Sequence, residues 1–137
     1  MEFFSTFGGN PVACAAGLAV LDVVETENLQ SNATKLGTQF LNTLKDFQQR
    51  YELIGDVRGE GFFLGVELVK DRTTLAPAAQ EASYIANRLR EKYILAGTDG
   101  PLHNVLKFRP SMVLEQRDMD YLLKSLEEIF EETAMCV

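Results

Sequence analysis

Two hydroxyl residues and two glycines lie together near the start of the chain. Ser5 and Thr6 are followed by Gly8 and Gly9, and then by Asn10-Pro11. Asparagine is a favoured N-cap and proline a favoured first helical residue, so a helix is predicted to begin at residue 11. Hydroxyl donors and flexible glycine amides at a helix start can hold a phosphate or another anion close to the backbone. A plain helix-entry turn is the alternative, with both hydroxyls bonded to local backbone groups.

Two cations lie close together in the last third of the chain. Lys107 and Arg109 alternate with Leu106 and Phe108. On a strand, this alternation sends both cations to one face and the apolar pair to the core. The cations could bind a carboxylate or a phosphate. From these residues alone, a solvated sheet face is favoured over an anion site.

The remaining polar residues predict structural roles. Arg58 lies between glycines, where an ion pair with Asp56 or Glu67 is expected, although it could also meet a carboxylate. His103 is the single histidine and follows a turn, so we expect it to be exposed and not to act as an acid–base group. The acidic run at residues 127–132 is interpreted as the solvated back of the last helix.

Composition predicts one globular domain in the chain as given. The 137 residues are 46% hydrophobic and 24% charged, with a net charge of −7, which argues against a nucleic-acid partner. No apolar run approaches the roughly 20 residues of a membrane span, so no membrane partner is expected. Cys14 and Cys136 lack metal-ligand spacing, and no metal site is predicted. Free thiols in a reduced, cytoplasmic compartment are favoured over a disulfide, and Cys14 is expected to pack in a core.

Hydrophobic periodicity predicts the elements that must position these residues. Helices are expected at residues 11–27, from 29 through 47, at 78–93 and through 119–130, and strands at 53–58, 62–69 and 104–109. Residues 98–101 (TDGP) predict a turn. Gly37 inside the second helix indicates close packing at that position. The pattern favours an α+β fold, with a small, mainly antiparallel sheet, helices on one face and a long helical lead-in.

Three sequence blocks are similar to one enzyme family. Residues 5–11 (STFGGNP), residues 55–68 with GDVRGEG and GVEL, and residues 106–110 (LKFRP) resemble the C-terminal part of class-III pyridoxal-phosphate (PLP) aminotransferases. The resemblance covers essentially the whole chain. Residues 71–78 and 98–107 look like a branch that includes phospho-lyases of phosphoethanolamine and phosphohydroxylysine, and alanine–glyoxylate aminotransferase-like proteins.

The resemblance implies a fold-type I enzyme with a large cofactor domain, a small C-terminal domain and a homodimeric assembly. Residues 1–28 would be the end of the large domain with its connecting helix, and residues 29–137 the small domain. The PLP-binding lysine of the family lies upstream of the STFGGNP block. The chain has six lysines, and none has the context to replace it: Lys35, Lys45, Lys70, Lys92, Lys107 and Lys124. The chain alone, without the N-terminal large domain as its partner, is therefore expected to be inactive.

The resemblance also implies roles for the candidate site residues. Thr6, with Ser5 beside it, would reach across the dimer to the phosphate of PLP. Lys107 stands where many family members have an arginine that holds the carboxylate of the small-molecule amino substrate, and Arg109 supplies a guanidinium two residues later. Lysine cannot reproduce the bidentate geometry of arginine, which puts the usual carboxylate clamp in doubt. The phospho-lyase-like branch resembles this chain in having lysine there.

A non-catalytic α+β module that dimerises or binds a small anion is the rival prediction. Under the enzyme hypothesis, the first helix is cut from its large domain and should expose an apolar face of small residues. Self-association or marginal stability of the isolated chain is then expected.

Overall fold

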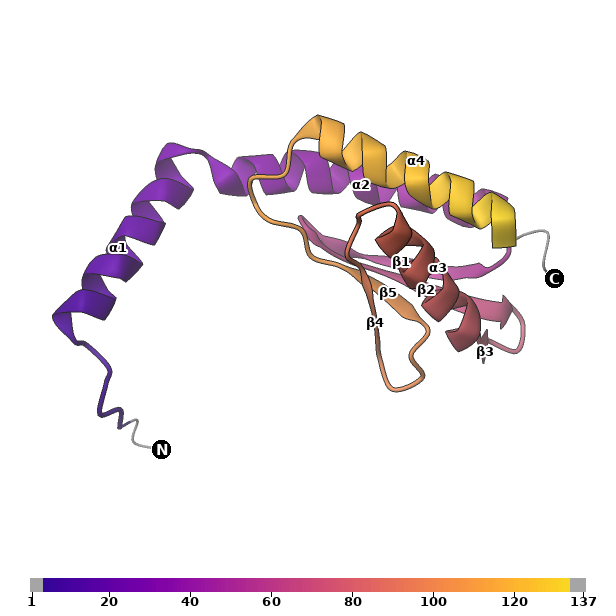
Figure 1. Cartoon of the computed structure of the whole chain (residues 1–137), viewed down its shortest axis with the longest axis horizontal. Helices are drawn as coiled ribbons and strands as arrows, with labels where there is room; N and C mark the ends of the chain where they lie inside the picture. Colours follow the sequence, from indigo (N-terminus) through magenta and orange to yellow (C-terminus); the bar gives the residue numbers. More distant parts are fainter. Residues whose placement is uncertain (1–3, 134–137) are drawn as a thin grey trace.

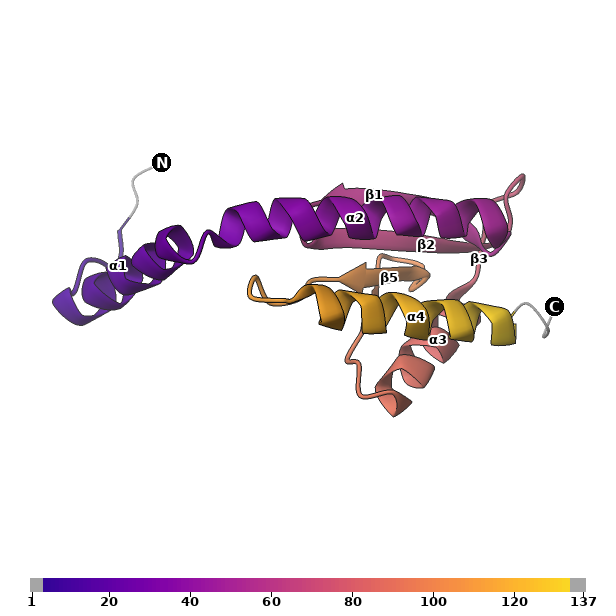
Figure 2. The same ribbon diagram turned by 90° about the horizontal axis from the view of Figure 1, so that it is seen from above.

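The structure is a computed structural model and describes residues 4–133 (Figures 1 and 2). Its elements are α1 (Pro11–Thr26), α2 (Leu29–Arg50), β1 (Ile54–Glu60), β2 (Phe63–Asp71), β3 (Ala76–Pro77), α3 (Ala79–Glu91), β4 (Gly97–Asp99), β5 (Val105–Phe108) and α4 (Gln116–Thr133). The α+β fold with a small antiparallel sheet is therefore confirmed.

The helical lead-in consists of two helices that meet at an elbow. The side chain of Asn10 accepts a hydrogen bond from the backbone N–H of Ala13 at 2.9 Å, and Pro11 is the first residue of α1, as the sequence predicts. Asn28 then takes a left-handed conformation with φ of 53°, which separates α1 from α2. Figures 1 and 2 show α1 extending away from the rest of the molecule.

The sheet is antiparallel throughout, in the order β1-β2-β5-β4, with the short β3 beside β2. Helices α2, α3 and α4 cover one face, as the two views show (Figures 1 and 2). The opposite face, which we call the open face, carries the side chains of Arg58, Glu67 and Lys107 together with the exposed ring of Phe63.

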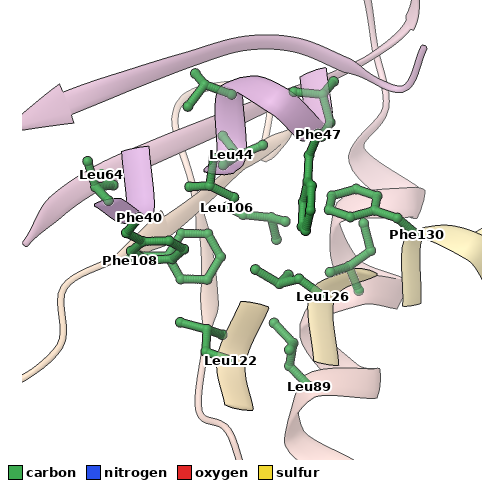
Figure 3. Close-up of a cluster of buried hydrophobic side chains, with 14 of the residues drawn as sticks. Phe40, Leu44, Phe47, Leu64, Leu89, Leu106, Phe108, Leu122, Leu126 and Phe130 are labelled. Carbon is green, nitrogen blue, oxygen red and sulfur yellow. The ribbon is translucent and has the colours of Figure 1, made fainter. Parts of the chain in front are cut away.

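The core lies between the three helices and the sheet, and Figure 3 shows its centre. Phe40 of α2 packs edge-on against Phe108 of β5, with ring centroids 5.3 Å apart. The alternation predicted for the strands holds, because Leu64, Val66 and Leu68 are all buried. Leu106 and Phe108 are also buried, so β5 directs its apolar pair to the core as expected.

Several sequence-based expectations about the elements were wrong. The third helix ends at Glu91, and Tyr93, expected on its buried face, is 99% exposed. Gly59 and Glu60 were expected to separate two strands but pair within β1. Thr98 and Asp99, expected in a turn, belong to β4 and pair with β5.

Helix α1 is exposed along its length. None of its residues is buried, and Cys14, expected in a core, is an exposed thiol. Its possible partner Cys136 lies outside the described residues. Over residues 4–133, no helix is both long and apolar enough to cross a bilayer. The same residues contain no cluster of side chains able to hold a metal ion.

Candidate functional site

The loop before α1 is organised by its own side chains. Ser5 Oγ accepts a hydrogen bond from the backbone N–H of Gly8 at 3.0 Å. Asn10 Nδ2 donates a hydrogen bond to the backbone carbonyl of Phe7 at 2.8 Å. Gly9 has a φ of +73°, which favours glycine. Ser5 thus behaves as the helix-entry alternative predicts. Thr6 is exposed, and its hydroxyl has no hydrogen-bond partner among residues 4–133.

This loop fits a phosphate group chemically. A free hydroxyl at Thr6 lies just before the N-terminus of a 16-residue helix, where partial positive charge accumulates. The first lysine of the chain is Lys35, so neither this loop nor α1 supplies an amine. The residues present could therefore hold the phosphate of a cofactor but could not bind its aldehyde.

Lys107 lies on the open face of β5. It pairs across the strands with Gly65 of β2 and with Gly97 of β4. Its ammonium forms an ion pair with Asp99 at the end of β4. The same carboxylate accepts the backbone N–H of Gly100 at 2.8 Å. These contacts hold the pKa of Asp99 below its ordinary value. The hydrogen bond from Lys107 is the larger cause, and the hydrogen bond from the backbone N–H of Gly100 is the next.

Arg109 lies just beyond the end of β5 and is exposed. Together with Lys107, it lines a hollow of about 480 Å³ between the segment after α3 and the start of α4. The structure therefore brings the two predicted cations to one hollow. Lys107 also lines a second hollow of about 450 Å³ on the open face, which Arg109 does not reach.

Arg58 has the structural role that the sequence favours. Its Nη1 donates to Asp56 Oδ2 at 2.6 Å and to Glu67 Oε2 at 2.7 Å. Both contacts raise the pKa of Arg58 above its ordinary value, and the contact with Asp56 has the larger effect. His103 is exposed, as predicted.

Asp99 is the site residue that sequence reasoning missed. Its place in a TDGP sequence indicates a turn, which hides its role as the partner of Lys107. No local sequence signal identifies this pair, because the pairing depends on the register of β4 against β5.

Comparison with known proteins places this geometry in a family. The sequence matches the family described as aminotransferase class-III over residues 2–130. The chain is similar to the mitochondrial alanine–glyoxylate aminotransferase 2 homolog 2 of Arabidopsis thaliana, with 42% identity over 126 residues. That match covers 92% of this chain and 26% of the relative.

Two solved structures share the fold. A phospholyase from Arthrobacter in complex with phosphoethanolamine aligns with a TM-score of 0.87 and 38% identity, over 94% of this chain and 31% of that one. A PLP-bound amine transaminase from an uncultivated Pseudomonas species aligns with a TM-score of 0.83 and 36% identity, over 96% of this chain and 30% of that one.

The chain belongs to the class-III aminotransferase family, which is PLP-dependent. The four helices and the antiparallel sheet of residues 4–133 correspond to part of a fold-type I enzyme. The chain spans about a quarter of the length of the curated relative that it matches.

Proposed function

We propose that this chain is the C-terminal part of a PLP-dependent class-III aminotransferase, which transfers an amino group between an amino compound and an oxo acid. The observation that carries the proposal is the open face of the sheet. This face presents Lys107 on a fold shared with a PLP-bound transaminase. The connecting elbow at Asn28 supports a boundary between residues 1–28, ending the large domain, and residues 29–137, forming the small domain.

The chain's own residues would contribute binding and orientation. Thr6 would donate a hydrogen bond from its hydroxyl to the phosphate of PLP. Ser5 would fix the conformation of the loop through its hydrogen bond with the backbone N–H of Gly8. Lys107 and Arg109 would orient the anionic group of the amino substrate. PLP, when bound, supplies an electron sink for the charge that develops on the substrate carbon. The resemblance supports a homodimer in which Thr6 serves the partner's cofactor.

The chain by itself would be inactive, because its six lysines lie outside the loop that would hold the phosphate. Two of these lysines already have carboxylate partners, Lys92 with Glu128 and Lys107 with Asp99. Catalysis would require an upstream domain that carries both the PLP-binding lysine and the pocket for the ring.

A phospho-lyase activity is the second candidate. Lys107 replaces the arginine of the usual carboxylate clamp, and the phospholyase structure is similar over 94% of this chain. A compact ammonium suits a phosphate as well as a carboxylate. A non-catalytic module that binds an anion or dimerises is the third candidate. One experiment with a chimeric enzyme distinguishes the three candidates. Cytoplasmic localisation is proposed with them, although the Arabidopsis relative is mitochondrial.

The test is a chimera in which this chain replaces the matching C-terminal quarter of the Arabidopsis relative. A functional chimera should bind PLP, seen by absorbance, and borohydride reduction followed by mass spectrometry should find the adduct on an upstream lysine. Amino transfer from alanine to glyoxylate supports the aminotransferase, and phosphate release from phosphoethanolamine supports the phospho-lyase. A folded chimera that binds PLP but catalyses neither reaction contradicts both.

The isolated chain provides the complementary measurement. Incubation with PLP should give no protein-bound absorbance band and no reduced lysine adduct. A stoichiometric adduct on one lysine of this chain would show that it has a complete cofactor site of its own, and would overturn the proposal.

A further inference from the structure

Two cations and two glycines alternate in a row across the open face. Arg58 of β1 pairs with Gly65 of β2, Gly65 pairs with Lys107 of β5, and Lys107 pairs with Gly97 of β4. Neighbouring strands are about 4.8 Å apart, so the Cα atoms of Arg58 and Lys107 are separated by roughly 10 Å, with only a glycine between them. The row therefore leaves a hollow over Gly65, flanked by two cations.

Glycine at position 65 keeps this hollow open. A Cβ atom at Gly65 would meet only Val105 Cγ1, at 3.3 Å, among the atoms within 4 Å. The hollow has a volume of about 450 Å³, and its lining includes Arg58, Gly65, Asp99 and Lys107. A small carboxylate or phosphate could enter it without moving the backbone.

Asp99 contacts the Lys107 ammonium at the hollow over Gly65. Lys107 lines the hollow over Gly65 and also the hollow that contains Arg109, whereas Asp99 lines only the first. The carboxylate of Asp99 is itself fixed by the backbone N–H of Gly100, at the tight turn where Gly100 has a φ of +81°. The ion pair thus lies at the hollow that Arg58 also lines.

The ion pair also limits what Lys107 can bind. An incoming carboxylate must compete with an intramolecular carboxylate that is already in contact with the ammonium. Arg58 is engaged in the same way by Asp56 and Glu67. Because the paired side chains are partly exposed to solvent, the competition from these carboxylates is modest.

We propose that Asp99 is a positioning and specificity residue: it holds Lys107 toward the hollow over Gly65 and weakens the binding of singly charged carboxylates there. This inference deepens the proposed function, since it assigns Lys107 to the site that receives the substrate's anionic group. Asp99 would act through Lys107 and would not touch the reacting atoms.

The experiment uses the 137-residue chain and acetate as the probe. Acetate is titrated at constant ionic strength, and NMR follows the Lys107 side-chain CεH₂ signal, assigned by its loss in Lys107→Met. The amide signals of Gly65 and Gly100 are followed in parallel. The proteins are the unaltered chain, Asp99→Asn, Asp99→Ser, and Asp99→Glu as the conservative replacement. Asp46→Asn removes an equal charge from an exposed position on α2 and serves as the matched control.

Removal of the Asp99 carboxylate should tighten acetate binding at Lys107 by about threefold, because a charged competitor is lost from a partly exposed ion pair. Asp99→Ser should repeat this effect, and it also covers the case in which Asp99→Asn fails to fold. Asp99→Glu should return the affinity toward that of the unaltered chain, and Asp46→Asn should leave it unchanged.

Equal acetate affinity, within twofold, in the unaltered chain and in both neutral variants would overturn the inference. An equal gain in Asp46→Asn would also overturn it, by showing a general charge effect. No response of Lys107 to acetate in any variant would show that the hollow does not accept anions. Because no PLP is needed, these outcomes are independent of whether the chimera is active.

Discussion

Gly37 shows how a single residue fixes the contact between α2 and the sheet. It is buried within the helix, and a Cβ atom placed there would lie 2.1 Å from the carbonyl oxygen of Gly61. Gly61 has a φ of +53° in the turn between β1 and β2. The helix therefore touches the hairpin turn backbone to backbone, and no side chain can yield to make room.

Gly37→Ala should destabilise the fold by roughly 3 kcal/mol, at the upper end of the cost of overpacking, because the new methyl group meets main-chain atoms. Denaturant unfolding followed by circular dichroism measures this change. Gly17→Ala is the matched control, since a Cβ atom at Gly17 in the middle of α1 would have no neighbour within 4 Å. That variant should be neutral or slightly stabilising, because alanine favours a helix. A Gly37→Ala chain as stable as the Gly17→Ala chain would disprove the contact.

The sequence predicted single residues well where local signals decide their conformation. The close packing at Gly37 and the helix start at Asn10 and Pro11 follow from such signals, and the structure confirms both. Asp99 could not be predicted in this way, because its pairing with Lys107 depends on the register of β4 against β5. The partners of Arg58 were predictable because Asp56 lies two residues earlier on the same face of β1 and Glu67 lies on the adjacent strand of the hairpin.

At the scale of elements, acidic side chains of α4 form ion pairs with neighbouring segments of the chain, although the sequence predicts that these side chains face solvent. Arg88 of α3 donates to both carboxylate oxygens of Glu132, from Nε at 2.8 Å and from Nη2 at 2.7 Å. Lys92 contacts Glu128 at 2.6 Å, and Arg50 of α2 contacts Glu127. The three carboxylates remain partly exposed, as the sequence favoured, but they also form ion pairs that the sequence did not predict, because their partners come from distant segments of the chain.

Glu132→Gln should make the chain less sensitive to acid between about pH 4.5 and pH 2. The Arg88 contacts lower the pKa of Glu132 from 4.5 to about 2 in the folded chain. A depressed pKa stabilises the fold above pH 4.5, and this contribution is lost as pH falls toward 2. The measurement is the free energy of unfolding against pH, taken as the difference between the unaltered chain and the variant.

Glu131→Gln is the control for that measurement, because the neighbouring Glu131 is exposed and forms no ion pair within residues 4–133. Its stability should keep the pH dependence of the unaltered chain. A Glu132→Gln chain with the same pH profile as the Glu131→Gln chain would contradict the role of the contact.

Element types were predictable because periodicity is strong in this chain, whereas element ends were set by tertiary contacts. The amphipathic pattern of α2, α3 and α4 identifies the faces that meet in the core. The predicted end of α3 lies two residues too late because Tyr93 continues the helical spacing of apolar residues, although its φ of 62° ends the helix. The two-residue β3 has no sequence signal and exists only through its pairing with β2.

At the scale of the whole molecule, α1 is the helix whose apolar side chains the rest of the chain leaves exposed. It has apolar residues around its circumference, which is typical of a helix buried on every side. Yet Leu18, Val20 and Leu21 are all more than 60% exposed. In a longer enzyme an upstream domain would cover these side chains, and in the isolated chain only a second copy is available to do so.

The isolated chain should therefore self-associate through α1, and Leu18→Glu combined with Leu21→Lys should abolish the association without adding net charge. Exposed apolar patches favour association, and charged side chains at their centre oppose burial. Sedimentation velocity over a range of concentrations measures the effect.

Leu95→Glu is the control, because Leu95 is 92% exposed but lies beyond α3, far from α1 in the sequence. This control should associate like the unaltered chain. A monodisperse monomer of the unaltered chain at all concentrations, with a sharp melting transition, would show that α1 needs no cover and would weaken the case for a missing domain.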